Sequence, residues 1–279
     1  MSVPVPLRMR PLEVGDVLDE TFRMYRRHFL LFAGISVILA IPSAAIFGVF
    51  FASFVAAFQQ TSSPSDLSFV APLLTGLGAG LAVNLLILPF TMGAVMYAAC
   101  ESALGRPVTA GGVFMGVLRR YFGLLGYWVL FAVTGYLALL LCVAPIALWI
   151  WIFVMWIAVT PAMFVENVGL GEAFGRSRRL VEGRWWRTFL MLFLISIIWD
   201  VVGIALGAFV QLAQFLLQLV VSPFLATGIS LATSELVSAL VNPILQIAIV
   251  LIYFDLRVRK EALDLFQMAH RLAAPQPAT

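Results

Sequence analysis

The chain has 279 residues, of which 62% are hydrophobic and 11% are charged, and its formal net charge is +3. Typical soluble domains carry about 25% charged residues, so this composition excludes an ordinary soluble domain and indicates a membrane domain. The basic residues are spread over four segments rather than gathered in one stripe, which argues against a nucleic-acid-binding protein.

The positions of the 17 Lys and Arg residues predict the topology, because three long intervals contain none of them. These intervals are 28–105, 121–175 and 188–256, and each can hold two spanning helices of about 20 residues. If each interval crosses the membrane out and back, every basic residue lies on the cytoplasmic side, as the positive-inside rule expects. We therefore predict an all-α, polytopic protein of the plasma membrane. Its six transmembrane helices form three hairpins, and both termini are cytoplasmic.

A single integral membrane domain is expected over residues 1–279. Residues 1–28 form a cytoplasmic arm and an amphipathic helix, 29–256 the six-span bundle, and 257–279 a cytoplasmic tail. The spans are expected near 29–55, 70–100, 121–143, 146–165, 187–215 and 234–254. Prolines inside these spans predict kinks, at Pro42, Pro89, Pro161 and Pro243. The outer segment 216–233 is apolar, so we expect it to lie in the membrane interface or to re-enter the membrane.

Three amphipathic helices are predicted on the cytoplasmic surface, over residues 14–27, 110–121 and 170–181. In each segment, apolar residues recur at the spacing of one helix face. The first also carries acids early and arginines late, which complements the helix dipole. Such helices lie along the membrane surface, with the apolar face toward lipid or the bundle.

The sequence offers little for catalysis or metal binding. Its histidines, His28 and His270, both fall at predicted membrane edges, so an intramembrane Ser–His hydrolase lacks its base. A His-rich metal site lacks ligands for the same reason. Asp200 is the one Asp expected at depth, whereas an aspartyl dyad needs two. We expect no catalytic residue, no metal and no cofactor.

The basic segments that flank the spans are candidate contacts for anionic lipid headgroups or for a protein partner at the membrane. In the structural interpretation, these residues set the topology and anchor the chain. In the functional interpretation, they form a docking surface for a cytoplasmic protein. The candidate residues are Arg26, Arg27, Arg119, Arg120, Arg176, Arg178, Arg179, Arg184 and Arg187.

Asp200 lies 13 residues past Arg187, which places it roughly 20 Å into the bilayer. Carboxylates at that depth are costly and often functional. Asp200 could hydrogen-bond Asn84 in a structural helix contact, or the two could form an intramembrane polar site on an ion or substrate pathway.

Three segments together resemble a known family. They are residues 10–19 with 25–29, residues 166–186, and the closing run Tyr253-Phe254-Asp255-Leu256-Arg257-Val258-Arg259-Lys260-Glu261 with the next four residues. This pattern resembles the prokaryotic membrane-domain family that is also found fused to some glycerophosphodiester phosphodiesterases. The activity of those fusions belongs to a separate soluble barrel domain. The resemblance therefore implies the membrane fold and no phosphodiesterase activity for these residues.

The predicted function is non-enzymatic: a membrane scaffold or accessory protein that acts on lipids or on a membrane partner. The alternative is a small-solute or ion transporter or channel with a polar interior around Asp200.

The topology can be tested by cysteine labelling in a variant that lacks Cys100 and Cys142. A cysteine at position 63 should react with an impermeant reagent only from outside, and cysteines at 112 and 178 only from inside. Labelling of position 178 from outside would rule out the six-span topology.

Overall fold

The computed structural model describes residues 11–60, 70–140 and 143–261, and every regular element in these ranges is a helix. The elements are α1 (Val14–Arg27), α2 (Phe29–Gln60), α3 (Val70–Ala82), the π-helix η1 (Val83–Ile87), α4 (Leu88–Ala103), α5 (Ala110–Leu140), α6 (Val143–Trp156), α7 (Val159–Val165), α8 (Leu170–Val181), α9 (Trp185–Leu217) and α10 (Pro223–Glu261). The expectation of an all-α chain is thus confirmed for the described part.

Within the described ranges, six helical segments are long and apolar enough to cross a membrane, as the sequence predicts. They are Phe29–Ser53, Val70–Ala103, Ala110–Leu139, Ile146–Val165, Trp185–Leu217 and Pro223–Glu261. The loop expected around residues 61–66 lies outside the described residues.

Two of the three predicted amphipathic helices are separate elements with the expected bounds. α1 begins in a capping box, in which Asp16 accepts a hydrogen bond from the backbone of Glu13, and it buries Val17 and Met24. α8 buries Ala173, Leu180 and other residues of one face against the bundle.

The third amphipathic helix, predicted over 110–121, does not exist as a separate element. Residues 110–121 are the first turns of the 31-residue helix α5, which continues without interruption into the candidate span. The sequence here has no Gly or Pro between Leu118 and Phe122 to end a helix, so the apolar stripe runs on. Val113 and Val117 are buried, while Phe114 is exposed.

The apolar segment 216–233, expected to join the fifth and sixth spans, is mostly helical. Only residues 218–222 form a turn, and Pro223 begins α10. Proline is favoured in the first turn of a helix because its missing N–H would have no partner there.

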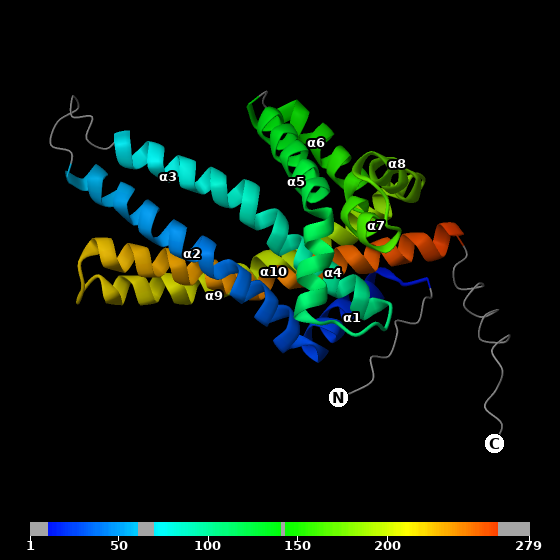
Figure 1. The fold of residues 1–279 in the computed structure, drawn as a ribbon, viewed down its shortest axis with the longest axis horizontal. Helices are drawn as coiled ribbons and strands as arrows, with labels where there is room; N and C mark the ends of the chain where they lie inside the picture. Colours follow the sequence, from blue (N-terminus) through cyan, green and yellow to red (C-terminus); the bar gives the residue numbers. More distant parts are fainter. Residues whose placement is uncertain (1–10, 61–69, 141–142, 262–279) are drawn as a thin grey trace, which may run out of the picture.

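α10 is the central helix, and six of the other helices pack against it. It contacts α2 and α9 along its length and α1, α4, α7 and α8 near its C-terminal end. Most of residues 241–256 are buried, including the large side chains of Tyr253 and Phe254. Figure 1 shows α2, α9 and α10 side by side, with α3 beside α2.

α5 and α6 form a second arm, which leaves the central helices at a steep angle, so that α3 and α5 diverge (Figure 1). Two of the predicted proline kinks coincide with breaks in regular α-helix. Pro89 follows the π-helix η1, and Pro161 follows the turn at Ile157–Ala158 between α6 and α7. Proline clashes with the carbonyl four residues before it, which accounts for the position of both breaks.

α2 and α10 approach closely at a pair of glycines. A Cβ atom added to Gly48 would lie 2.9 Å from the carbonyl oxygen of Gly228 and 3.3 Å from the Cβ atom of Ala232. The two backbones can reach this separation only because neither glycine carries a side chain.

Gly48→Ala should therefore lower the free energy of unfolding, by about 1–3 kcal/mol, because the added methyl group overpacks the contact. Gly34→Ala is the matched control on the same helix, since a Cβ atom there meets nothing within 4 Å. It should be neutral or stabilising by roughly 0.5–1 kcal/mol through helix propensity. Thermal unfolding of both variants in detergent measures the difference, and equal melting temperatures would contradict the close contact.

Candidate functional site

The last turns of α10 carry two rows of polar side chains on different sides of the helix. Tyr253, Arg257 and Glu261 follow at intervals of four residues and form one row, whereas Asp255 and Arg259 form the other. Residues four apart share a helix face, and residues two apart do not. Each row therefore meets a different part of the chain. We call this region, together with the start of α9, the basic end.

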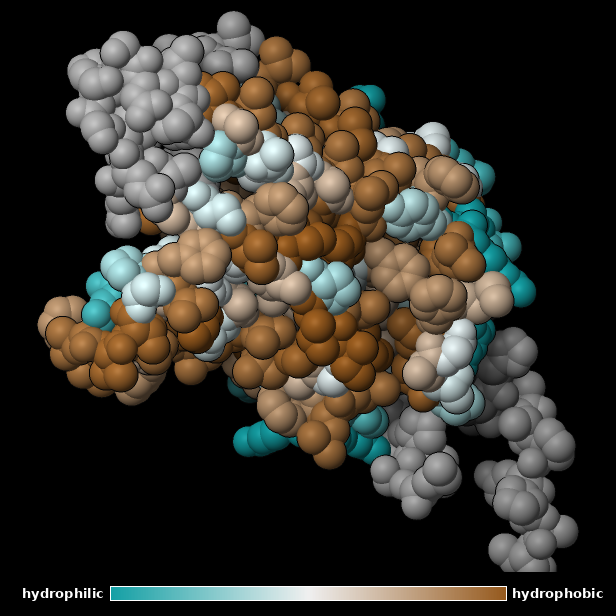
Figure 2. Space-filling view, turned by 60° about the vertical axis from the view of Figure 1, so that its left-hand side comes forward, coloured by the Kyte–Doolittle hydropathy of each residue, from teal (hydrophilic) through white to brown (hydrophobic). Residues whose placement is uncertain are grey.

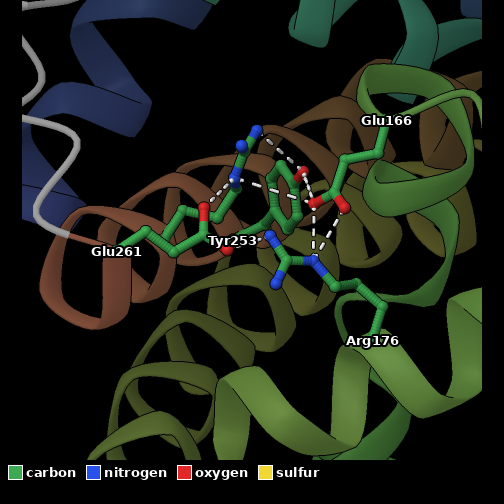
Figure 3. Close-up of polar contacts among 5 residues, drawn as sticks. Glu166, Arg176, Tyr253 and Glu261 are labelled. Carbon is green, nitrogen blue, oxygen red and sulfur yellow. Dashed lines mark hydrogen bonds and ion pairs between the residues drawn. The ribbon is translucent and has the colours of Figure 1, made fainter. Parts of the chain in front are cut away.

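The first row pairs with Glu166, at the end of α7, and with Arg176 of α8 (Figure 3). Arg176 of α8 donates from Nε to both carboxylate oxygens of Glu166, at 2.7 and 3.0 Å, and also pairs with Glu261. The Tyr253 hydroxyl donates to Glu166 at 2.7 Å. Arg257 lies 3.0 Å from Glu261 and 3.6 Å from Glu166. Burial disfavours the charge of Arg176, but its hydrogen bonds to Glu166 and Glu261 outweigh burial and raise the pKa of the guanidinium.

The second row encloses Asp255, whose side chain is 0% exposed. Arg187, at the start of α9, donates to one Asp255 oxygen at 2.6 Å, and Arg259 donates to the other at 2.9 Å. The backbone N–H of Leu12 also donates to Asp255, at 2.8 Å, while the Leu12 carbonyl accepts from both arginines. A buried carboxylate is tolerated only when its charge and lone pairs are matched in this way. The row therefore ties the N-terminal segment, α9 and α10 together.

The basic end is held by ion pairs, and we call these two rows of contacts the clamp. Four arginines face three acids in the two rows, and both faces of the α10 C-terminus are occupied. Among the described residues, no group of three or more His, Cys, Asp or Glu side chains could hold a metal ion.

The structure divides the nine basic residues singled out by sequence into three engaged in polar contacts, one half-buried and five exposed. Arg176 and Arg187 are engaged in the two rows, and Arg120 donates to the Val168 carbonyl at 2.7 Å and to the Asn167 side chain. Arg184 is half-buried. The others are exposed, namely Arg26, Arg27, Arg119, Arg178 and Arg179.

Asp200 and Asn84 belong to different parts of the structure. Asp200 is exposed on α9, which packs mainly against α10. Asn84 belongs to η1, which packs against α2, α3, α4 and α5, and its side chain lies outside the described residues. Asp200 instead lines a groove of about 280 Å³ between α9 and α10.

A larger cleft, with a volume of about 930 Å³, lies between the α2–α3 pair and the α5–α6 arm. In the described part of the chain, every residue that lines it is aliphatic, aromatic or glycine, including Phe47, Leu77, Trp128, Phe131 and Trp149. Figure 2 shows one face of the molecule as mostly hydrophobic, with many of the hydrophilic side chains gathered at the right-hand and lower edges.

The sequence singles out the charged segment 253–261 but does not predict which residues it pairs with. The i,i+4 spacing of Asp255 with Arg259 and of Arg257 with Glu261 was the available signal for the two rows. The apolar cleft had no such signal, because it depends on the angle between two helix pairs. Comparison of the chain with protein-family models, with curated proteins and with solved structures gives no match.

Asp255→Asn should destabilise the protein strongly, because Arg187 and Arg259 would lose the buried charge that balances theirs. The expected loss in unfolding free energy is about 3 kcal/mol, the lower end for breaking a buried pair, since both arginines are partly exposed. Glu101→Gln is the control, because its pair with Arg106 is at the surface and should contribute about 1 kcal/mol or less. A melting temperature for Asp255→Asn as high as that of Glu101→Gln would contradict the clamp.

Proposed function

We propose that this chain is a non-enzymatic integral membrane protein that binds lipid chains in the cleft between the α2–α3 pair and the α5–α6 arm. Under this proposal the six candidate spans cross the plasma membrane as three hairpins, with the basic end and both termini in the cytoplasm. The proposal also places the chain with the membrane-domain family that its closing segment resembles. It assigns an accessory role on lipids and no catalytic step.

The observation that carries the proposal is the cleft itself. Its volume of about 930 Å³ is near the upper end of the range of about 300–1,000 Å³ found for small-molecule sites. Its lining offers dispersion contacts and no charged group, so it suits hydrocarbon chains rather than a polar solute.

The position of the cleft also favours lipid as the occupant. The walls of the cleft come from α2, α3, α5 and α6, all of which belong to candidate spans. Lining residues between Leu73 and Leu85 form one wall, and those between Trp128 and Leu139 form the other. An apolar cleft at that depth is open to the hydrocarbon phase, whose chains match its surface. The exposed arginines Arg26, Arg27, Arg119, Arg178 and Arg179 would face anionic headgroups at the cytoplasmic surface.

The transporter alternative is less well supported. A polar pathway around Asp200 requires this residue to face the interior of the bundle, whereas it is exposed on α9. We therefore do not propose transport.

The proposal is tested by filling the cleft. Gly76→Leu and Ala132→Leu place new side chains in the cleft from opposite walls. The double variant should retain several-fold less phospholipid than the wild type when the purified proteins are compared by native mass spectrometry.

The matched control is the double variant Gly78→Leu and Val133→Leu, on the same two helices but outside the cleft lining. It adds leucine side chains at exposed positions and should retain lipid as the wild type does. If the two double variants lose lipid equally, or neither does, the cleft is not the lipid site.

A further inference from the structure

The groove between α9 and α10 has a different character from the apolar cleft. It is lined by Trp199, Asp200, Gly203 and Gly207 of α9 and by Ser234 and Ser238 of α10, among others. A carboxylate, two hydroxyls and two glycines therefore meet on one outward face of the molecule.

Placing the charged side chain of Asp200 at its position costs free energy. Asp200 is 13 residues along α9 from Arg187, about 20 Å at the rise of an α-helix, so with the spans placed as proposed above it lies deep in the hydrocarbon core. Its side chain is exposed, and it forms no hydrogen bond or ion pair within the described part of the chain. Charged side chains at this depth are rarely exposed to lipid, because lipid tails cannot balance the charge; they face protein groups or water instead.

The polar groups around Asp200 are also unsatisfied. Hydroxyls of Ser53, Thr75 and Thr134 on other helices donate back to carbonyls of the preceding turn. Among the described residues, the hydroxyls of Ser234 and Ser238 form no hydrogen bond of this kind. The indole nitrogen of Trp199 is buried and has no hydrogen-bond partner there either. Several hydrogen-bonding groups that line the groove therefore lack partners among the described residues.

The remaining walls allow a helix to approach closely. Gly203 and Gly207 are one turn apart on α9, and Ser234 and Ser238 are one turn apart on α10. A Cβ atom added to either glycine would meet nothing within 4 Å. Two neighbouring pairs of small residues, separated by one turn, are the geometry that lets transmembrane helices pack backbone to backbone.

We propose that this groove binds a transmembrane helix of another protein, and that this helix carries a Lys or Arg side chain at the depth of Asp200. Charge complementarity decides between this occupant and a second copy of the chain. Within the six candidate spans, Lys and Arg occur only in the early turns of α5 and α9 and in the last turns of α10, and residues 28–105, 121–175 and 188–256 contain none. A second copy would therefore bring no cation to Asp200, and a symmetric contact would place two carboxylates together.

The proposal can be tested with designed helices in lipid vesicles. The probes are labelled Leu/Ala-rich transmembrane peptides that are identical except for Arg, Leu or Glu at the central position. Binding to the labelled full-length protein is followed by fluorescence energy transfer. We expect the Arg peptide to bind roughly tenfold more tightly than the Leu peptide.

Two variants test the charge. Asp200→Asn keeps the shape of the side chain and should remove the preference for the Arg peptide. Asp200→Arg should reverse it, so that the Glu peptide binds best. This gain of binding shows that the variant protein is folded. An Arg peptide that binds no better than the Leu peptide, or a preference unchanged in Asp200→Asn, would overturn the proposal.

A further pair tests the groove. Gly207→Leu fills it, whereas Ala208→Leu adds bulk at the next residue, which is exposed and outside the groove lining. Binding of the Arg peptide should fall at least several-fold in Gly207→Leu and remain unchanged in Ala208→Leu. Equal effects of the two variants would contradict the site. Self-association of the protein without peptide, if lost in Gly207→Leu, would show that the groove is a contact between copies and would also overturn the proposal.

Discussion

Asp255 carries a charge into a part of the protein that water does not reach, and the chain has to balance that charge with its own groups. Arg187 and Arg259 supply the opposite charge, and the backbone of Leu12 supplies a further donor. Because all three partners come from different segments, the same carboxylate fixes where the N-terminal arm, the start of α9 and the end of α10 lie. Satisfying one buried group therefore positions three segments of the chain.

The rest of the fold can be understood from the central place of α10. Its middle and C-terminal turns are buried, so each neighbouring helix is packed against a fixed surface. α2 follows it through the glycine contact between Gly48 and Gly228, and α9 runs beside it to the turn at 218–222. α5 and α6 have few such restraints and lean away, which leaves the apolar cleft on one side. The groove at Asp200 lies between α9 and α10, within the central set of helices.

The sequence predicts the elements of this fold better than their mutual arrangement. The basic-free intervals give six long apolar helices, and the periodicity gives α1 and α8 with their bounds. In contrast, α9 is apolar on all sides, so its sequence marks no buried face, and the outward position of Asp200 could not be predicted. The stripe at 110–121 was wrongly separated from the span, because amphipathicity tells which side of a helix is apolar but not where the helix ends. The cleft depends on interhelical angles, which no local pattern encodes.

The hydrogen bond between Leu12 and Asp255 joins residues 243 positions apart, nearly the full length of the chain. During synthesis the N-terminal segment leaves the ribosome long before its partner does. Its backbone N–H and C=O must therefore remain hydrated, or bound to something else, while the helices in between are made. The clamp closes only when the end of α10 has been translated. The contact of Leu12 thus forms only after α10 has been made, and in a nascent chain stopped short of residue 255 the backbone of Leu12 has no Asp255 to bind.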